Sequence, residues 1–253
     1  MMKFKTTLLL SAVALSTFST NAFATPKKGT KTNRNTKARI ETGMRTITED
    51  AARAHVYFLA DDLLEGRRAG ERGSRIAKRY IESRIREIGL KPLLGDSYEQ
   101  PFEACGVQRL KRSPRFYVNA DSIAKIKKGV YQSLALSNVL AMLPGRKSDE
   151  YVVVGAHLDH EGQYADVAGD GIYNGADDNA SGVSAVLQIM KAFAASGEQP
   201  ERTVVFAFWD GEEYGLLGSQ YFTDHFSGMA KVKGYLNFDM VGSGTDSKYL
   251  MYF

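Results

Sequence analysis

The sequence predicts an α/β protein whose largely parallel sheet is covered by helices on both faces. Residues 151–156 and 203–208 are short, continuously apolar runs, which are typical of strands buried on both faces. Residues 181–195, between them, carry apolar side chains at helical spacing. Residues 216–226 and 232–238 then repeat the order of helix and strand. This alternation indicates parallel strands joined by helical crossovers.

Two helices are expected before the sheet. Thr46 and Glu49 have the spacing of a capping box, which predicts a helix over residues 49–61. Apolar residues at helical spacing predict a second helix, which begins at Ser74 as its cap and ends at Gly89. The helices should pack on the sheet through their apolar faces.

The loop between these helices, residues 66–73, combines glycines with three arginines. Arg67, Arg68 and Arg72 form a charge run that we expect to be solvated. Binding of a substrate carboxylate is the alternative interpretation.

A further strand is expected over residues 138–143. Pro144 and Gly145 follow it and predict a hairpin or turn that leads to the strand at 151–156. Residues 107–135 lack a clear period and are expected to contain extended segments.

Residues 1–24 have the composition of an export signal. Two lysines precede an apolar stretch over residues 6–18, which is too short for a lasting membrane anchor. Ala22-Phe23-Ala24 has the pattern of a cleavage site. We therefore expect an exported protein, periplasmic or secreted, that begins at Thr25 and has no stable membrane anchor.

Basic residues are concentrated in residues 25–45 of this 253-residue chain, whose formal net charge is +4. This segment lacks interleaved aromatic residues, so we expect a disordered linker and no nucleic-acid partner. Residues 46–253 suffice for one domain with a sizeable core. Cys105 is the single cysteine, which excludes an intramolecular disulfide.

Potential metal ligands gather after or near the expected strands. They are His157, Asp159, Asp177, Glu212, Glu213 and Asp239. Because the carboxyl ends of parallel strands meet at one edge of a sheet, these side chains should collect there. Imidazole and carboxylate ligands without cysteine suit zinc or another borderline divalent ion. The sequence therefore predicts a metal-dependent hydrolase.

The local sequence also suggests roles for these ligands. Asp177 is the candidate bridging ligand, because its Gly- and Asn-rich loop lets the backbone turn sharply toward a metal. The side chains of Glu212 and Glu213 must point in different directions, so one can bind metal while the other acts as general base. Asp159 lies on the same side of an extended segment as His157 and is expected to orient its imidazole.

Four ordered motifs, HLDH, GADDNASG, GEEYGLLGS and NFDM, resemble those of the zinc aminopeptidases of family M28. With the earlier AHVYFLADDLLEGR and QPF segments, the likeness covers nearly all of residues 50–245. The resemblance implies a three-layer α/β/α sandwich with a mixed sheet and removal of N-terminal residues from peptides by a metal-activated water. Relatives with this fold act as carboxypeptidases or glutaminyl cyclases, and these remain alternatives.

Carried over to this sequence, the resemblance implies a centre of two zinc ions. It implies that His157 and Asp239 bind one ion and that Glu213 binds the other. It further implies that Asp177 bridges both ions and that Glu212 is the general base.

The family places a further histidine ligand of the second zinc well beyond the equivalent of Asp239, whereas this sequence ends at Phe253. His55 and His225 fall on expected helices and do not replace it. We therefore expect the last elements of the sandwich to be missing and one tight zinc site in this chain. The expected peptidase activity is then little or none, and an inactive zinc-binding fragment is the alternative to an enzyme.

Overall fold

The computed structural model describes residues 31–109, 112–165 and 167–242. The expected export signal and its cleavage site lie outside these described residues. Within them, no helix combines the length and the apolar character needed to cross a membrane.

The centre of the fold is a mixed sheet with strand order β3-β2-β4-β8-β5-β9, and β1 pairs with β4. The strands are β1 (Lys91–Pro92), β2 (Glu99–Arg109), β3 (Arg112–Tyr117), β4 (Gln132–Leu143), β5 (Lys147–His157), β8 (Arg202–Trp209) and β9 (Val232–Asn237). β6 (Gly162–Gln163) and β7 (Ile172–Tyr173) form a separate small ribbon. The predicted mixed sheet is confirmed. Its parallel part is limited to β8, β5 and β9, and the other pairs are antiparallel.

Of the hairpin or turn expected after β4, the hairpin is not formed, because β8 lies between β4 and β5, and residues 144–146 are a short connection between them. Val139 of β4 is opposite Phe208, and Val153 of β5 is opposite Val205. β8 is buried from Thr203 to its last residue. Such an apolar strand is most stable at the centre of a sheet, where both of its edges are paired and both faces are covered.

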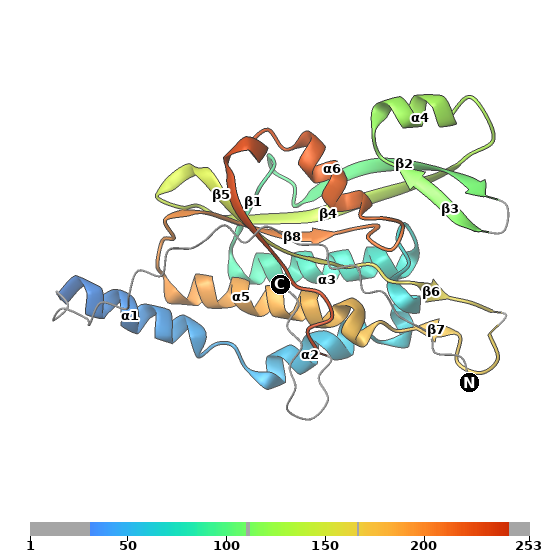
Figure 1. Cartoon of the computed structure of the whole chain (residues 1–253). Coiled ribbons are helices and arrows are strands. Elements are labelled where there is room, and N and C mark those ends of the chain that lie inside the picture. The colour runs from blue at the N-terminus through green and yellow to red at the C-terminus, as the bar shows by residue number, and fades with distance from the viewer. Residues whose placement is uncertain (1–30, 110–111, 166, 243–253) are drawn as a thin grey trace, which may run out of the picture.

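Helices cover both faces of the sheet, which confirms the three-layer sandwich (Figure 1). One layer contains α1 (Lys31–Met44), α2 (Glu49–Leu59), α3 (Arg72–Ile88) and α5 (Gly182–Ser196), and the opposite side carries α4 (Ala120–Ile126) and α6 (Leu217–His225). The short turns are η1 (Asp62–Arg67), η2 (Ala176–Ser181) and η3 (Met229–Lys231). The helices predicted from the sequence are confirmed as α2, α3, α5 and α6.

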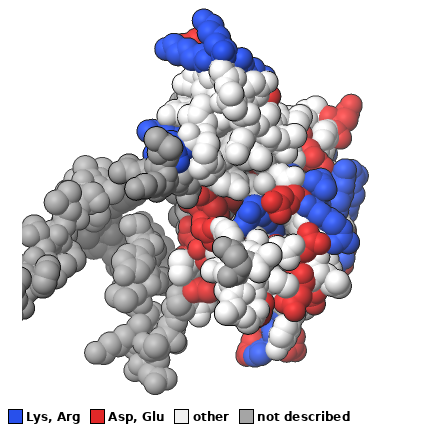
Figure 2. Space-filling model, turned by 90° about the vertical axis from the view of Figure 1, so that its right-hand side faces the viewer, with Lys and Arg blue, Asp and Glu red and all other residues white. Residues whose placement is uncertain are grey.

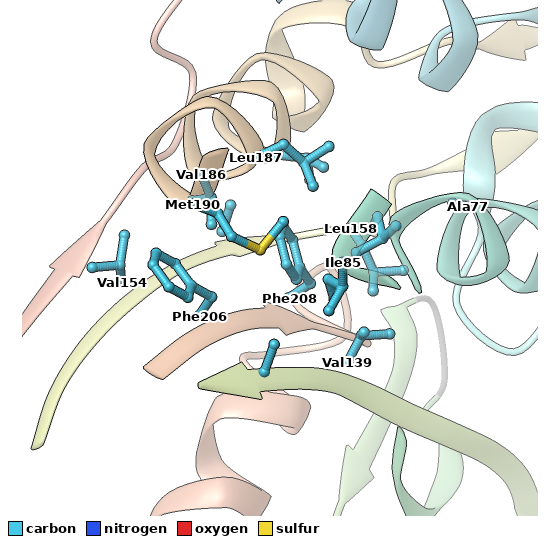
Figure 3. Packing of buried hydrophobic residues seen from close by; sticks show 14 of the residues in the cluster. Ala77, Ile85, Val139, Val154, Leu158, Val186, Leu187, Met190, Phe206 and Phe208 are labelled. Atoms are coloured by element: carbon cyan, nitrogen blue, oxygen red, sulfur yellow. The ribbon is translucent and has the colours of Figure 1, made fainter. Parts of the chain in front are cut away.

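The main core lies between the sheet and the layer of α3 and α5. Leu187 and Met190 of α5 point toward Phe206 and Phe208 of β8, and Ile85 of α3 joins them (Figure 3). These side chains are fully buried. Burial of one such side chain stabilises a fold by about 1.5–3 kcal/mol, so this cluster fixes β8 and β5, whose ends carry the candidate site.

The N-terminal helix boundaries differ from the predicted ones. Thr48, rather than Thr46, caps α2 by accepting a hydrogen bond from the backbone N–H of Ala51. The Thr46 hydroxyl instead donates to the carbonyl of Gly43, just after α1. Ser74 lies inside α3, where its hydroxyl is buried. Ser74 is therefore not a cap, because α3 already begins at Arg72.

The disordered linker expected over residues 25–45 is wrong for the part that the structure describes. Residues 31–44 form α1, which packs along α5. A side chain in place of Gly43 would bring its Cβ within 2.3 Å of the Ala192 carbonyl oxygen, so glycine permits this close approach. The contact with α5 stabilises a helix that composition alone does not predict.

Candidate metal centre

His157 is the last residue of β5 and lies at the centre of the site, with 3% of its surface exposed. Its Nδ1 lies 3.1 Å from the backbone carbonyl oxygen of Asp159, to which the ring N–H can donate. Its Nε2 lies 3.0 Å from Asp178 Oδ1 and 3.4 Å from Asp239 Oδ1. The Nδ1 contact orients the ring so that Nε2 faces two carboxylates.

Asp178, not the predicted Asp177, joins this cluster. The Asp177 carboxylate accepts hydrogen bonds from the backbone N–H of Gly242, at 2.7 Å, and from the Ser181 hydroxyl, at 3.1 Å. Asp177 therefore holds the loop itself. Gly175, with φ 61°, begins the turn, and a Cβ there would lie 2.2 Å from the Asp178 carbonyl oxygen. This tight turn directs the second aspartate of the pair toward His157.

The two oxygens of Asp178 face two different imidazoles. Oδ1 lies near His157, as described, and Oδ2 lies 3.9 Å from Nδ1 of His160. The same Nδ1 is 2.7 Å from Glu213 Oε1. Among the described residues, three groups of potential ligands have ligand atoms within 4.8 Å of one another. One is His157, Glu212 and Glu213, and the other two, which share Asp178, are His157, Asp178 and Asp239, and His160, Asp178 and Glu213. A carboxylate shared in this way is suited to bridge two cations.

From the sequence alone, His160 is either a residue that supports the metal ligands or an ordinary loop residue. The HLDH motif could have indicated it, because the second histidine follows the strand end by three residues. Its position becomes clear only when the loop with Glu213 folds against β5, and the structure places its side chain with 12% of its surface exposed.

Asp239 follows β9 and reaches the site through a contact with the loop of Asp178. The side chain of Asn179 donates to the carbonyl of Phe238 at 3.0 Å, and its Oδ1 accepts from the backbone N–H of Gly182 and Met240. These bonds hold the end of β9 against the start of α5. Asp239 is therefore brought to His157 as the sequence predicts.

The buried carboxylate of Asp159 supports the loop of the two adjacent glutamates. Its Oδ1 accepts the backbone N–H of Glu212 at 3.1 Å, and its Oδ2 accepts that of Glu213 at 3.3 Å. The nearest contact of Asp159 with the imidazole of His157 is made by its backbone carbonyl, whereas its carboxylate is 3.8 Å away from Nδ1. Asp159 therefore positions both the imidazole and the glutamates.

A second buried network lies behind this loop and fixes its start. The Asp210 carboxylate accepts hydrogen bonds from Lys78 Nζ at 2.9 Å, from Ser74 Oγ at 3.3 Å and from the backbone N–H of Ser137 at 3.0 Å. Asp210 is fully buried, so these partners are needed to offset the loss of its hydration.

Burial and neighbouring charges shift the pKa values of the site. Burial lowers the pKa of His157, but the carboxylates of Asp178 and Asp239 more than offset this, and the pKa rises to about 10. Burial raises the pKa of Asp159 to about 7. Burial also raises the pKa of Glu212, against the opposing effect of His157. The acidic groups are therefore partly desolvated around one imidazole.

The donor atoms fit a cation better than they fit one another. Asp178 Oδ1 is buried and accepts no hydrogen bond, although it lies 3.0 Å from His157 Nε2. The two atoms are thus close but are not aligned as a hydrogen bond, which is the arrangement of two ligands that point toward the same cation. Nitrogen and oxygen donors without sulfur suit zinc.

The site is partly accessible to solvent, because 34% of the side-chain surface of Asp178 and 39% of that of Asp239 is exposed. Figure 2 shows carboxylates gathered near the middle of the face that lies to the right in Figure 1, with cationic side chains beside them. Excess negative charge at a protein surface favours a bound cation and attracts a cationic group of a ligand.

The fold and this cluster define the class of protein: an α/β sandwich with a candidate zinc centre at the edge of its parallel strands. Residues 138–252 match the model of Peptidase family M28.

Two curated relatives illustrate the likeness. Leupeptin-inactivating enzyme 1 of Streptomyces exfoliatus is 39% identical over 108 residues, which are 42% of this chain and 23% of the relative. Leucine aminopeptidase 2 of Trichophyton equinum is 36% identical over 116 residues, which are 45% of this chain and 21% of the relative. The matched part is thus less than a third of the length of these relatives.

Solved structures support the same fold over most of the chain. An aminopeptidase from Aneurinibacillus sp. strain AM-1 aligns with a TM-score of 0.56 and 16% identity, over 81% of this chain and 73% of that one. A Zn-dependent exopeptidase from Parabacteroides distasonis aligns with a TM-score of 0.54 and 20% identity, over 78% of this chain and 63% of that one. At these identities the likeness supports the fold alone.

Proposed function

We propose that the protein is a zinc-dependent aminopeptidase that hydrolyses N-terminal residues from peptides. The observation that carries this proposal is the shared position of Asp178 between two imidazole groups, with Glu212 beside them. The M28 match and the relatives named leucine aminopeptidases support the substrate class.

The two ligand groups suggest two ions of unequal affinity. His157, Asp178 and Asp239 would hold the first ion, and His157 is nearly inaccessible to solvent. His160, Asp178 and Glu213 would hold the second. We expect tight binding at the first group, whose imidazole is fixed by Asp159, and weaker binding at the second. When bound, zinc polarises a substrate carbonyl and activates a water molecule for attack.

Glu212 is the proposed general base. Its backbone is fixed by Asp159, and its side chain is half-buried beside His157. The raised pKa of this carboxyl group suits a base that takes a proton from the attacking water and gives it to the leaving amine nitrogen. Glu213 differs from Glu212 in its close contact with His160, which suits a ligand instead.

Carboxypeptidase activity is the second candidate function. A probable glutamate carboxypeptidase of Arthroderma benhamiae is 35% identical over 112 residues, which are 42% of this chain and 14% of the relative. An aminopeptidase must recognise the amino group of its substrate, whereas a carboxypeptidase must recognise a carboxylate. The acidic surroundings favour the amino group, since opposite charges attract.

A peptide panel tests this choice. The zinc-loaded protein is offered a peptide with a free N-terminus, its N-acetylated form, and an N-acetylated peptide that ends in glutamate. Because His160 supplies an imidazole to the second group of ligands, we expect activity instead of the little or none expected from the sequence alone. The N-terminal residue should be released from the first peptide only. Release of C-terminal glutamate from the third peptide would instead establish the carboxypeptidase, and no hydrolysis of any peptide by a protein that retains zinc would contradict both functions.

We also propose that the protein is exported to the periplasm or secreted, on the basis of the composition of residues 1–24. The expected mature N-terminus is Thr25. N-terminal sequencing of protein from the periplasm or medium tests this proposal, and Met1 at the N-terminus of that protein would contradict it.

A further inference from the structure

Arg67 is a buried cation that binds only backbone carbonyls among the described residues. Its exposed fraction is 1%, and it is one of the largest fully buried side chains of the protein. No described carboxylate lies within ion-pair distance of its guanidinium. The expectation that the arginines of residues 66–73 are solvated is therefore wrong for Arg67. A buried charge of this kind is costly unless its surroundings are built to hold it.

The guanidinium donates to five carbonyl oxygens from three parts of the chain. Nη1 donates to the carbonyls of Leu59 and of Asn174, the second at 2.6 Å. Nη2 donates to the carbonyls of Gly175 at 2.9 Å and Asp178 at 3.5 Å. Nε donates to the carbonyl of Leu158 at 3.0 Å. All N–H directions of the planar group are thereby used.

Two of these three parts carry the candidate metal ligands. Leu158 lies directly between His157 and Asp159 at the end of β5, and the carbonyl of Asp178 belongs to a proposed bridging ligand. The main chain of Arg67 adds a further link, because its carbonyl accepts the backbone N–H of His160 at 3.2 Å. One residue thus connects both ligand groups.

The backbone around Arg67 is shaped for this approach. Arg67 has φ 53°, a left-handed conformation that costs a non-glycine residue about 1–2 kcal/mol. Gly66 precedes it, and a Cβ there would lie 2.3 Å from the Gly162 carbonyl oxygen and 2.6 Å from that of Tyr173. The chain therefore accepts an unfavourable conformation where the guanidinium enters between the two loops.

We propose that Arg67 is a positioning residue of the metal centre, whose guanidinium sets the separation between the β5 end and the loop of Asp178. This inference rests on the proposed function, since it concerns the ligands of the proposed zinc ions. The charge contributes as well. Burial lowers the pKa of Arg67 to about 10, whereas Asp159, Asp178 and Glu213 raise it, so the group remains a cation at neutral pH amid the acidic ligands.

Lysine cannot reproduce this geometry, although it preserves the charge. Its ammonium is a compact group with three donors, whereas the planar guanidinium of Arg67 has five donors in a fixed arrangement. Arg67→Lys therefore separates the positioning role from simple charge balance.

The test compares Arg67→Lys with Arg72→Lys in the full chain. Arg72 belongs to the same arginine-rich segment, but its side chain is exposed and pairs with Glu65 at 2.9 Å. Zinc affinity is measured by competition with a chromophoric chelator, and amide hydrogen exchange is followed across the chain without metal. Circular dichroism and thermal unfolding report the state of the fold.

For Arg67→Lys we expect at least about tenfold weaker zinc binding, the range seen for lost supporting groups around metal ligands. We also expect faster amide exchange confined to residues 157–160 and 172–180, with unchanged exchange in β2 and β4. Arg72→Lys should match the original protein in both measurements. Unchanged zinc affinity and unchanged exchange in folded Arg67→Lys would overturn the inference.

If Arg67→Lys does not fold, Arg67→Gln is measured, because its amide can still donate to the carbonyls. Failure of both variants to fold would overturn a role limited to the metal centre. The proposed function fails separately: it is contradicted if the original protein binds no zinc, whereas the exchange measurement needs no metal and still decides whether Arg67 orders the two segments.

Discussion

Replacing the two adjacent aspartates one at a time tests the geometry of the site. Asp178→Asn removes a negative ligand whose oxygens face His157 Nε2 at 3.0 Å and His160 Nδ1 at 3.9 Å. Asp177→Asn leaves a neutral oxygen that can still accept the Gly242 N–H, at 2.7 Å in the structure. The two substitutions have the same chemistry and neighbouring positions, so each serves as the control for the other.

The expected difference is large. Loss of a group that merely supports a ligand lowers metal affinity by about 10–100-fold. Asp178 belongs to both ligand groups, so Asp178→Asn should lower zinc affinity by at least about 100-fold, or about 2.7 kcal/mol at 1.36 kcal/mol per tenfold change. Asp177→Asn weakens the two hydrogen bonds that this carboxylate accepts from Gly242 and Ser181 and should cost about 0.5–1.5 kcal/mol of stability, with zinc affinity nearly unchanged.

Chelator competition gives the affinity, and elemental analysis after dialysis gives the zinc content of each variant. Circular dichroism verifies that both variants are folded. If Asp177→Asn lost zinc while Asp178→Asn retained it, the loop geometry would be refuted and the role first inferred for Asp177 would stand.

Four further substitutions test three other parts of the account. Glu212→Gln should retain zinc, measured by elemental analysis, but its peptide turnover should fall by a factor of about 10²–10⁴. Glu213→Gln should lose zinc from the second group of ligands. Equal loss of zinc from both variants would contradict these assignments. Lys78→Met removes the ion-pair partner of the buried Asp210 and should lower the free energy of unfolding, measured with denaturant, by about 3–5 kcal/mol. A decrease below about 1 kcal/mol would contradict the importance of this pair. Burial lowers the pKa of His55 in the folded state, so the contribution of this residue to stability is largest above its ordinary pKa of 6.5 and falls as the pH falls. His55→Gln should therefore lessen the loss of stability between pH 7 and pH 5, and an identical pH profile of unfolding would refute this cause.

Local sequence patterns predict the part of the fold that forms the parallel strands. The predicted ranges agree with the structure to within two residues at both ends of α5, β8, α6 and β9 and at the end of β5, whereas β5 begins four residues earlier than predicted. Each of these elements is marked by helical periodicity or by an apolar run, and glycine or polar residues mark its ends. The predicted meeting of ligands at one edge follows from this order of elements. His157, Glu212, Glu213 and Asp239 accordingly lie together in the structure.

Features that depend on contacts distant in sequence could not be predicted in this way. The neighbour of β4 is β8 and not β5. The apolar strand β8 is stable where strands pair with both of its edges, and this depends on the whole sheet. Asp177 and Asp178 are adjacent residues of the same type, so the sequence does not distinguish them. The turn that begins at Gly175 determines that Asp178 faces His157. Sequence reasoning also missed Arg67, since its five acceptors are carbonyl groups, which every residue possesses.

The most direct test of the central claim is to locate zinc by anomalous X-ray diffraction from crystals of the zinc-loaded protein. We expect an anomalous peak among His157 Nε2, Asp178 and Asp239, with ligand distances of about 2.0–2.2 Å, and a weaker peak among His160, Asp178 and Glu213. Zinc bound elsewhere, or no zinc within reach of His157 and Asp178 in protein saturated with the ion, would contradict the account.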